Sequence, residues 1–126
     1  MTRAEFDAYC GAMTGTTNVI QWGNASVWKI GGKIFAICSN WGSKAETGHD
    51  DDGPRFSFKC SDLAFELLPD QEGIVPAPYL ARAKWVQLQT PDAMSDEDLK
   101  LHLDKAYEII ARKLTAKHRK ELRLDF

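Results

Sequence analysis

Apolar residues recur at helical spacing near the start of the chain. The apolar set comprises Phe6, Tyr9, Cys10 and Met13. Ahead of them, Thr2 and Glu5 match a T-x-x-E capping box, in which each side chain accepts a hydrogen bond from the other residue's backbone amide. The pattern predicts an N-terminal helix, and Gly15 can supply the left-handed residue that ends it.

A longer stripe of the same spacing lies in the C-terminal part of the chain. Ser95 is the expected cap, with Asp98 three residues further on. The stripe consists of Leu99, Leu103, Ala106, Ile110 and Leu114, with Tyr107 at its edge. We therefore predict that the last helix is the longest, and the pattern leaves open whether it continues to Arg123.

Short apolar runs between these helices predict strands. ASVWKI and KIFAIC are joined by Gly31-Gly32, and two glycines tolerate the positive φ that a tight type I′ hairpin requires. KIFAIC is almost entirely apolar, as in a central strand covered on both faces. RFSFKC and AKWVQLQT are the next two predicted strands. GIVPA is at most a short edge strand, and VIQW is left open as a separate one.

The strand RFSFKC alternates between apolar and polar residues. Successive side chains of a strand point to opposite faces, so one face carries Phe56, Phe58 and Cys60, and the other carries Arg55, Ser57 and Lys59. Ser61 then caps a short predicted helix, DLAFELL. The order is helix, three strands, helix, one or two strands, helix, which predicts an α+β fold.

The composition fits one globular domain spanning residues 1–126, with 44% hydrophobic and 27% charged residues. A chain of this length buries about two-thirds of the surface of its unfolded form, so it needs no disulfide or metal to fold. The net charge of −2 excludes a protein that is basic overall. Any attraction for phosphate must therefore come from a local patch.

The cysteines and the chain termini bear on location. Three cysteines without a CxxC spacing (Cys10, Cys38 and Cys60) are typical of reduced thiols in the cytoplasm. MTRAEF has no apolar core of a signal peptide. No apolar run reaches the roughly 20 residues of a membrane span. We expect a cytoplasmic protein without a membrane partner.

The segment RKLTAKHRKELR, residues 112–123, carries six positive side chains and one acid. The last helix begins with three acids, and the helix dipole favours acids at the start and bases at the end, which explains much of the cluster without a partner. The alternative is a phosphate-binding ridge, in which each contact releases counterions. Its candidate residues are Lys113, Lys117, Arg119, Lys120 and Arg123, with Arg82 and Lys84 as an extension.

Two further lysines, Lys29 and Lys33, flank the Gly-Gly turn. A basic hairpin tip has the shape of a wing that enters a nucleic-acid groove. Charges at such a tip also keep strand edges from pairing with neighbours, and this second interpretation is favoured.

Other site chemistry finds little support in the sequence. His49 with Asp50–Asp52 offers metal ligands, but the spacing lacks the alternation of a calcium loop, so a solvated turn is favoured. The three cysteines fall on apolar positions, and no pattern ties His102 or His118 to a thiol. We expect no enzyme and no metal or cofactor site. Among the tryptophans, Trp41 is the one expected to be exposed and to border a groove.

The chain resembles the MmcQ/YjbR-like family. The resemblance rests on the amphipathic first helix, on Ala25–Trp28 leading into KIFAI, on FSFKC, on PAPYLARAKWVQL and on DKAYEIIARKL, and it covers almost the whole chain. Trp85 is its most telling position.

The resemblance implies an α-β3-α-β2-α order similar to type III secretion chaperones, with helices on one side of an antiparallel sheet. It also implies a DNA-binding protein with a double-wing surface. Our first hypothesis is accordingly a nucleic-acid-binding protein that uses the seven cations above. The second is a protein- or peptide-binding module without nucleic acid. The sequence leaves the oligomeric state open.

Overall fold

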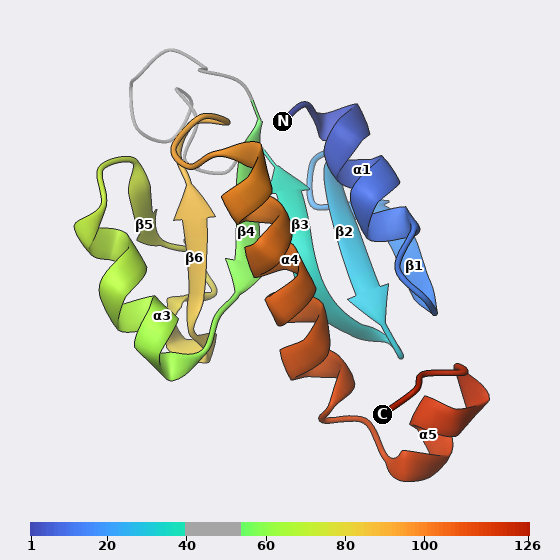
Figure 1. Ribbon diagram of the computed structural model, residues 1–126. Helices are drawn as coiled ribbons and strands as arrows, with labels where there is room; N and C mark the ends of the chain where they lie inside the picture. Colours follow the sequence, from blue (N-terminus) through green and yellow to red (C-terminus); the bar gives the residue numbers. More distant parts are fainter. Residues whose placement is uncertain (40–53) are drawn as a thin grey trace.

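The computed structural model describes residues 1–39 and 54–126. Its elements are α1 (Arg3–Gly11), β1 (Thr16–Gln21), β2 (Ala25–Ile30), β3 (Lys33–Ser39), β4 (Arg55–Lys59), α3 (Asp62–Leu67), η1 (Leu68–Asp70), β5 (Ile74–Pro76), η2 (Ala81–Ala83), β6 (Trp85–Leu88), α4 (Asp96–Ala111) and α5 (Ala116–Glu121) (Figure 1). The candidate residues Trp41, His49 and Asp50–Asp52 lie outside the described ranges.

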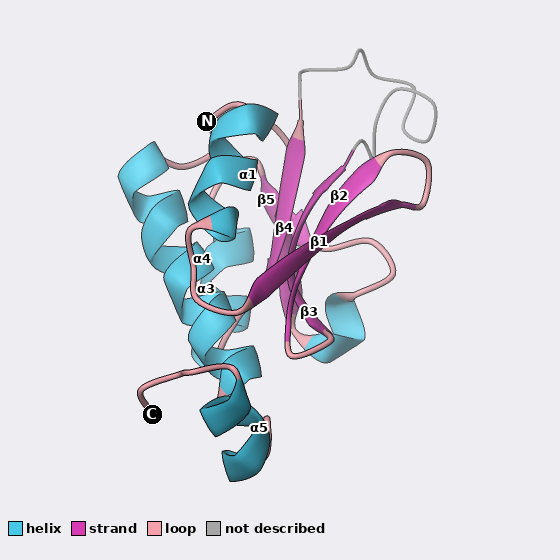
Figure 2. Ribbon diagram, turned by 90° about the vertical axis from the view of Figure 1, so that its right-hand side faces the viewer, coloured by secondary structure: helices cyan, strands magenta, loops and turns pink. Residues whose placement is uncertain are grey.

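The strands form one antiparallel sheet in the order β1-β2-β3-β4-β6-β5. The helices α1, α3 and α4 cover one face of this sheet, here called the helix face, as Figure 2 shows. The other face, here called the open face, carries part of the segment between β5 and β6. The predicted α+β fold with helices on one side is therefore confirmed.

The sheet has six strands rather than the predicted five. The additional strand, β1, contains most of the VIQW segment that the pattern left open. Among the described residues it pairs with β2 alone, at the edge of the sheet, and Val19 and Ile20 are both exposed. An edge strand with exposed apolar side chains has no burial alternation, so the sequence carries only a weak signal for it.

The first helix has the predicted capping box but ends earlier than expected. Thr2 N donates to Glu5 Oε1 at 2.9 Å, and Glu5 N donates to Thr2 Oγ1 at 3.1 Å. The helix ends at Gly11, before Gly15, whose φ of +79° is left-handed as predicted. The Thr16 hydroxyl donates to the Cys10 carbonyl at 2.9 Å, which also accepts a hydrogen bond from Met13 N at 3.2 Å.

The last helix does not continue to Arg123. It ends at Ala111, and Thr115 starts the separate helix α5 by accepting a hydrogen bond from His118 N at 3.1 Å. The break allows Leu114 to reach the core, where it is 5% exposed. A continuous helix would have kept α5 in line with α4.

The main core lies between the helix face and its helices. It contains the predicted stripe of the last helix together with Phe6, Phe35, Phe56 and Phe58, all four fully buried. The rings of Phe6 and Phe56 lie 5.1 Å apart. A smaller apolar cluster on the open face joins Val27, Ile37 and Trp85 to the segment between β5 and β6.

Candidate phosphate-binding surface

The predicted cations of the C-terminus are spread over a turn and a short helix. Lys113 lies in the turn after α4, Lys117 and Lys120 lie in α5, and Arg123 follows α5 with a left-handed φ of +62°. All four are exposed. The helical ridge that an unbroken helix would have formed is therefore replaced by a bent segment.

Arg119 has a structural role in this segment. Its Nη1 donates to the carbonyls of Arg112 and Leu114, both at 3.1 Å. Arg119 is half-buried, and its Nε has no hydrogen-bond partner within residues 1–39 and 54–126. It ties α5 to carbonyls at the end of α4, and this use of the guanidinium competes with a phosphate contact.

Two further lysines, Lys59 and Lys84, lie near Lys113. Lys59, at the end of β4, donates from Nζ to the carbonyl of Ala83, directly before Lys84. Burial lowers the pKa of Lys59 below its usual value, and the positive charges of Lys113 and, to a smaller extent, Lys84 lower it further. The negative charge of Asp62 acts in the opposite direction and raises this pKa. The predicted extension through Lys84 thus shares one electrostatic neighbourhood with Lys113.

Ion pairing differs between these cations and their neighbours. Within the described part of the chain, no carboxylate pairs with Arg82, Lys84, Lys113, Lys117, Lys120 or Arg123. Arg112, in contrast, donates from Nε to Glu108 at 3.0 Å and lies over the ring of Phe126. Lys84 lies over the ring of Phe65, at 5.1 Å from its centre, which leaves its charge available to a further anion.

The Gly31-Gly32 turn packs against the junction of α4 and α5. Both glycines have positive φ, +60° and +82°, as the hairpin prediction required. A Cβ on Gly31 would lie 2.6 Å from Leu114 Cδ1 and 3.1 Å from His118 Cε1, so glycine is needed for this contact. The contact brings the turn, and with it exposed Lys33, next to α5.

The three cysteines and His102 lie outside this surface, and they are buried or half-buried. Burial raises the pKa of Cys38 to about 12 and that of Cys60 to about 11, and it also raises the pKa of Cys10. These thiols are protonated at neutral pH. His102 stacks on Phe58 at 5.4 Å between ring centres, and burial lowers its pKa.

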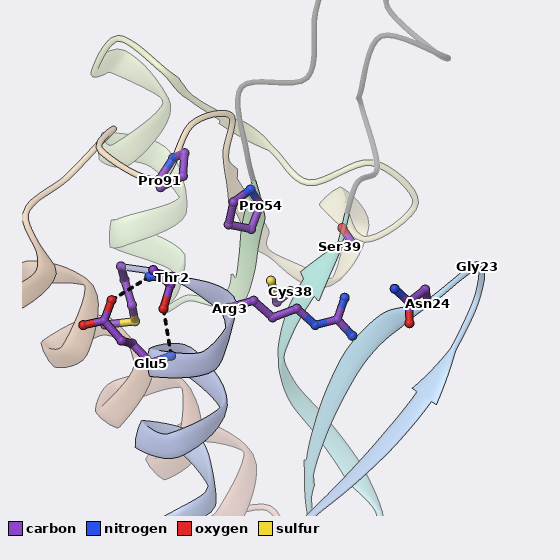
Figure 3. A pocket seen from close by; sticks show the side chains of 10 residues that line it. Thr2, Arg3, Glu5, Gly23, Asn24, Cys38, Ser39, Pro54 and Pro91 are labelled. Carbon is purple, nitrogen blue, oxygen red and sulfur yellow. Dashed lines mark hydrogen bonds between the residues drawn. The ribbon is translucent and has the colours of Figure 1, made fainter.

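A cavity of about 600 Å³, the end cavity, opens where α1 begins. Figure 3 shows Arg3 extending across it toward Asn24 and Ser39, with Cys38 between. The hydrogen bonds of Thr2 and Glu5, drawn as dashed lines, already occupy those two side chains. Ser39 and Pro54 border the segment that the structure does not describe, so we assign no ligand here.

A second cavity of about 380 Å³, the sheet cavity, lies on the open face. Its lining is Trp22, Ile34, Ile37, Tyr79, Leu80 and Trp85. On the same face of the sheet, Arg55 and Ser57 are 4% and 0% exposed, although the alternation of RFSFKC had placed them on its polar side. Local sequence patterns give no sign of this cavity because its lining comes from segments far apart along the chain.

The comparisons with known proteins concern the family and the fold. The YjbR family model matches residues 11–109. The fold is similar to Deinococcus radiodurans protein DR2400, described with domain DUF419, at TM-score 0.80 and 21% identity, covering 98% of this chain and 88% of that one. A Pseudomonas syringae protein gives TM-score 0.70 and 18% identity, covering 87% and 99%. No curated protein matches.

Two consequences follow for the candidate surface. The family match includes Lys59, Arg82 and Lys84 but ends before the basic segment 112–123. At identities near 20%, the similarity to the solved structures supports the fold and gives no information about a ligand.

In the described residues, no helix is long and apolar enough to cross a membrane.

Proposed function

The chain belongs to the YjbR family, and we propose that it binds the phosphate backbone of a nucleic acid. The binding surface, here called the basic face, consists of Lys59, Lys84, Lys113, Lys117 and Lys120, with Arg82 and Arg123 at its margins. The observation that supports the proposal is that Lys59, Lys84 and Lys113, from separate elements, lie close enough to affect one another's charge. None of the cations of the basic face forms an ion pair with a carboxylate among the described residues. Arg119 is left out because its guanidinium holds α5 to the end of α4.

Unpaired cations gain most from a polyanion. A paired cation must first give up its carboxylate, whereas an unpaired one exchanges only water and releases condensed counterions from the nucleic acid. Because the net charge is −2, this local gathering is the part of the molecule that attracts phosphate. Backbone contacts of this kind position the protein and carry no sequence information.

Binding is tested by fluorescence anisotropy with a labelled DNA duplex of mixed sequence, between about 50 and 200 mM salt. We expect the affinity to fall steadily as salt rises. The double variant Lys117→Gln/Lys120→Gln should bind more weakly, with a salt slope shallower by about 0.9 for each phosphate that the variant no longer neutralises.

The matched control is Lys100→Gln/Lys105→Gln, which removes the same charge from two exposed positions of α4. It should bind as the unmodified chain does. Absence of binding at about 50 mM salt, a flat salt dependence, or equal weakening in both double variants would exclude the basic face as the binding surface.

A second candidate function is association with another protein, and one observation favours it. The outer edge of β1 has no strand partner in the described residues, and Ile20 on this strand is 53% exposed. Such an edge can accept an added strand from a partner. Sedimentation and pull-down with Ile20→Lys test it, because the new charge should release a partner from this edge whereas DNA binding is retained.

The proposal includes a cytoplasmic location and no catalytic step. Location is supported by the three cysteines, which are free and buried. Their protonated thiols supply no nucleophile at neutral pH.

A further inference from the structure

Most buried polar side chains of the described residues gather on the open face. Ser39, Arg55, Ser57 and Gln87 are buried there, and Ser26 is the remaining buried polar residue in this part of the chain. Ser39 pairs with Arg55 across β3 and β4, and Ser57 pairs with Gln87 across β4 and β6. Paired residues share a face of the sheet, so these four form one polar strip.

Arg55 is a buried cation with unsatisfied donors. It is 4% exposed, and its Nε and Nη1 make no hydrogen bond within the described residues. The hydroxyl of Ser57, next on the same face, is also buried and without a partner there. A buried guanidinium with two unsatisfied donors is strongly unfavourable, so the fold holds a position for an anion at this place.

The sheet cavity adjoins this strip. Ile37, in its lining, pairs with Ser57, and Trp85 precedes Gln87 by two positions on the same face. Paired residues on neighbouring strands lie about 5 Å apart, and alternate residues along a strand lie about 7 Å apart. Arg55 pairs with Ser39, which lies two positions along β3 from the lining residue Ile37 on the same face. An arginine side chain is long enough to span this distance.

We propose that the sheet cavity and Arg55 together bind a small carboxylic acid with an apolar body. An unsatisfied guanidinium N–H of Arg55 donates a charge-assisted hydrogen bond to the carboxylate, and the Ser57 hydroxyl donates a second bond. The apolar body lies against Ile34, Leu80 and Trp85. A volume of about 380 Å³ is in the range of small-molecule sites. Its charged group, Arg55, lies at the opposite end of β4 from Lys59 of the basic face.

Two probes with the same apolar body test the charge requirement. We expect 4-phenylbutanoate to bind and 4-phenylbutanamide to bind about tenfold or more weakly, because only the acid forms a charge-assisted bond. The measurement is a titration followed by nuclear magnetic resonance. The Arg55 Nε–H and the Trp85 indole N–H signals should both shift with the acid.

Two variants separate the halves of the site. Arg55→Gln should bind acid and amide equally, since it removes the charge and keeps a polar side chain. Leu80→Ala should weaken both probes and retain the preference for the acid. Lys100→Gln removes one charge from α4 and is the matched control, which should bind as the unmodified chain does.

Equal affinity of the unmodified chain for acid and amide would overturn the proposal, as would shifts confined to residues outside the open face. A third overturning result concerns the chain's own carboxylates at Asp50–Asp52, outside the described residues. If the Arg55 Nε–H signal moves when these are replaced by Asn and does not respond to the acid, the anion for Arg55 is internal. DNA binding is measured in parallel, so failure here is distinguishable from failure of the basic face.

Discussion

The two faces of the sheet differ in what they bury. The helix face buries aromatic and aliphatic side chains under α1 and α4, and the rings of Phe6 and Phe56 meet there. The open face buries an arginine, two serines and a glutamine beside a cavity. A close-packed apolar layer stabilises a fold, whereas buried polar groups without hydrogen-bond partners reduce its stability.

This difference separates the roles of the two faces. The helix face carries apolar residues that the sequence pattern predicted, and their side chains fill the space between the sheet and its helices. The open face combines Arg55 with the apolar cavity, and Lys59, at the far end of β4 from Arg55, belongs to the basic face. Recognition chemistry is therefore expected where the helices do not cover the sheet.

The largest expected effect comes from truncating the helix face. Phe56→Ala removes a fully buried ring and should lower the free energy of unfolding by about 3–5 kcal/mol. Ile34→Ala, in the lining of the sheet cavity, should cost only about 1 kcal/mol, because it enlarges a cavity that already exists. Urea denaturation measures both, and equal decreases would remove the contrast between the faces.

High pH should destabilise the helix face through its cysteines. Cys10, Cys38 and Cys60 all belong to its core, and burial raises their pKa above the ordinary value of 9.0. Between about pH 8 and 10 these thiols ionise in the unfolded chain and stay protonated in the folded one. Each should lower the free energy of unfolding by about 1.4 kcal/mol over this interval.

The Cys38→Ala variant tests this pH dependence. Its decrease in stability from about pH 8 to 10, followed by urea denaturation, should be smaller than that of the unmodified chain by about 1.4 kcal/mol. If the variant and the unmodified chain lose the same free energy of unfolding between about pH 8 and 10, the Cys38 thiol ionises in the folded chain.

The smallest effect has the opposite sign and concerns the open face. Arg55→Met replaces a buried guanidinium with unsatisfied donors by an apolar side chain of similar length. We expect the free energy of unfolding to rise by about 1 kcal/mol, because the cost of desolvating the charge disappears. The thermal unfolding midpoint measures it. A clear decrease in stability would show that Arg55 has a structural partner.

Much of the fold could be predicted because it depends on short-range sequence patterns. Thr2 and Glu5 form the predicted capping box, Gly31 and Gly32 make the predicted turn, and the stripe from Leu99 to Leu114 is buried. Periodicity and capping depend on neighbours within a few residues, and such neighbours are visible in the sequence.

The sites were less predictable because they depend on distant contacts. The alternation of RFSFKC correctly separated Arg55 from Phe56, but a polar position suggests solvent exposure unless its cover is known. Arg119 resembles the other cations of its segment in the sequence, and only its hydrogen bonds to Arg112 and Leu114 set it apart. The edge strand β1 was also uncertain, since burial does not mark it.

The amino-acid sequence by itself determined the helix starts, the glycine turn and the apolar stripes that make the helix face, because each rests on short-range geometry. Tertiary structure alone decided where the last helix ends, that Arg119 binds the carbonyls of Arg112 and Leu114, and that Arg55 is buried on the open face. The physical reason is that burial and charge pairing are set by groups far apart along the chain, which come together only when the sheet and its helices pack.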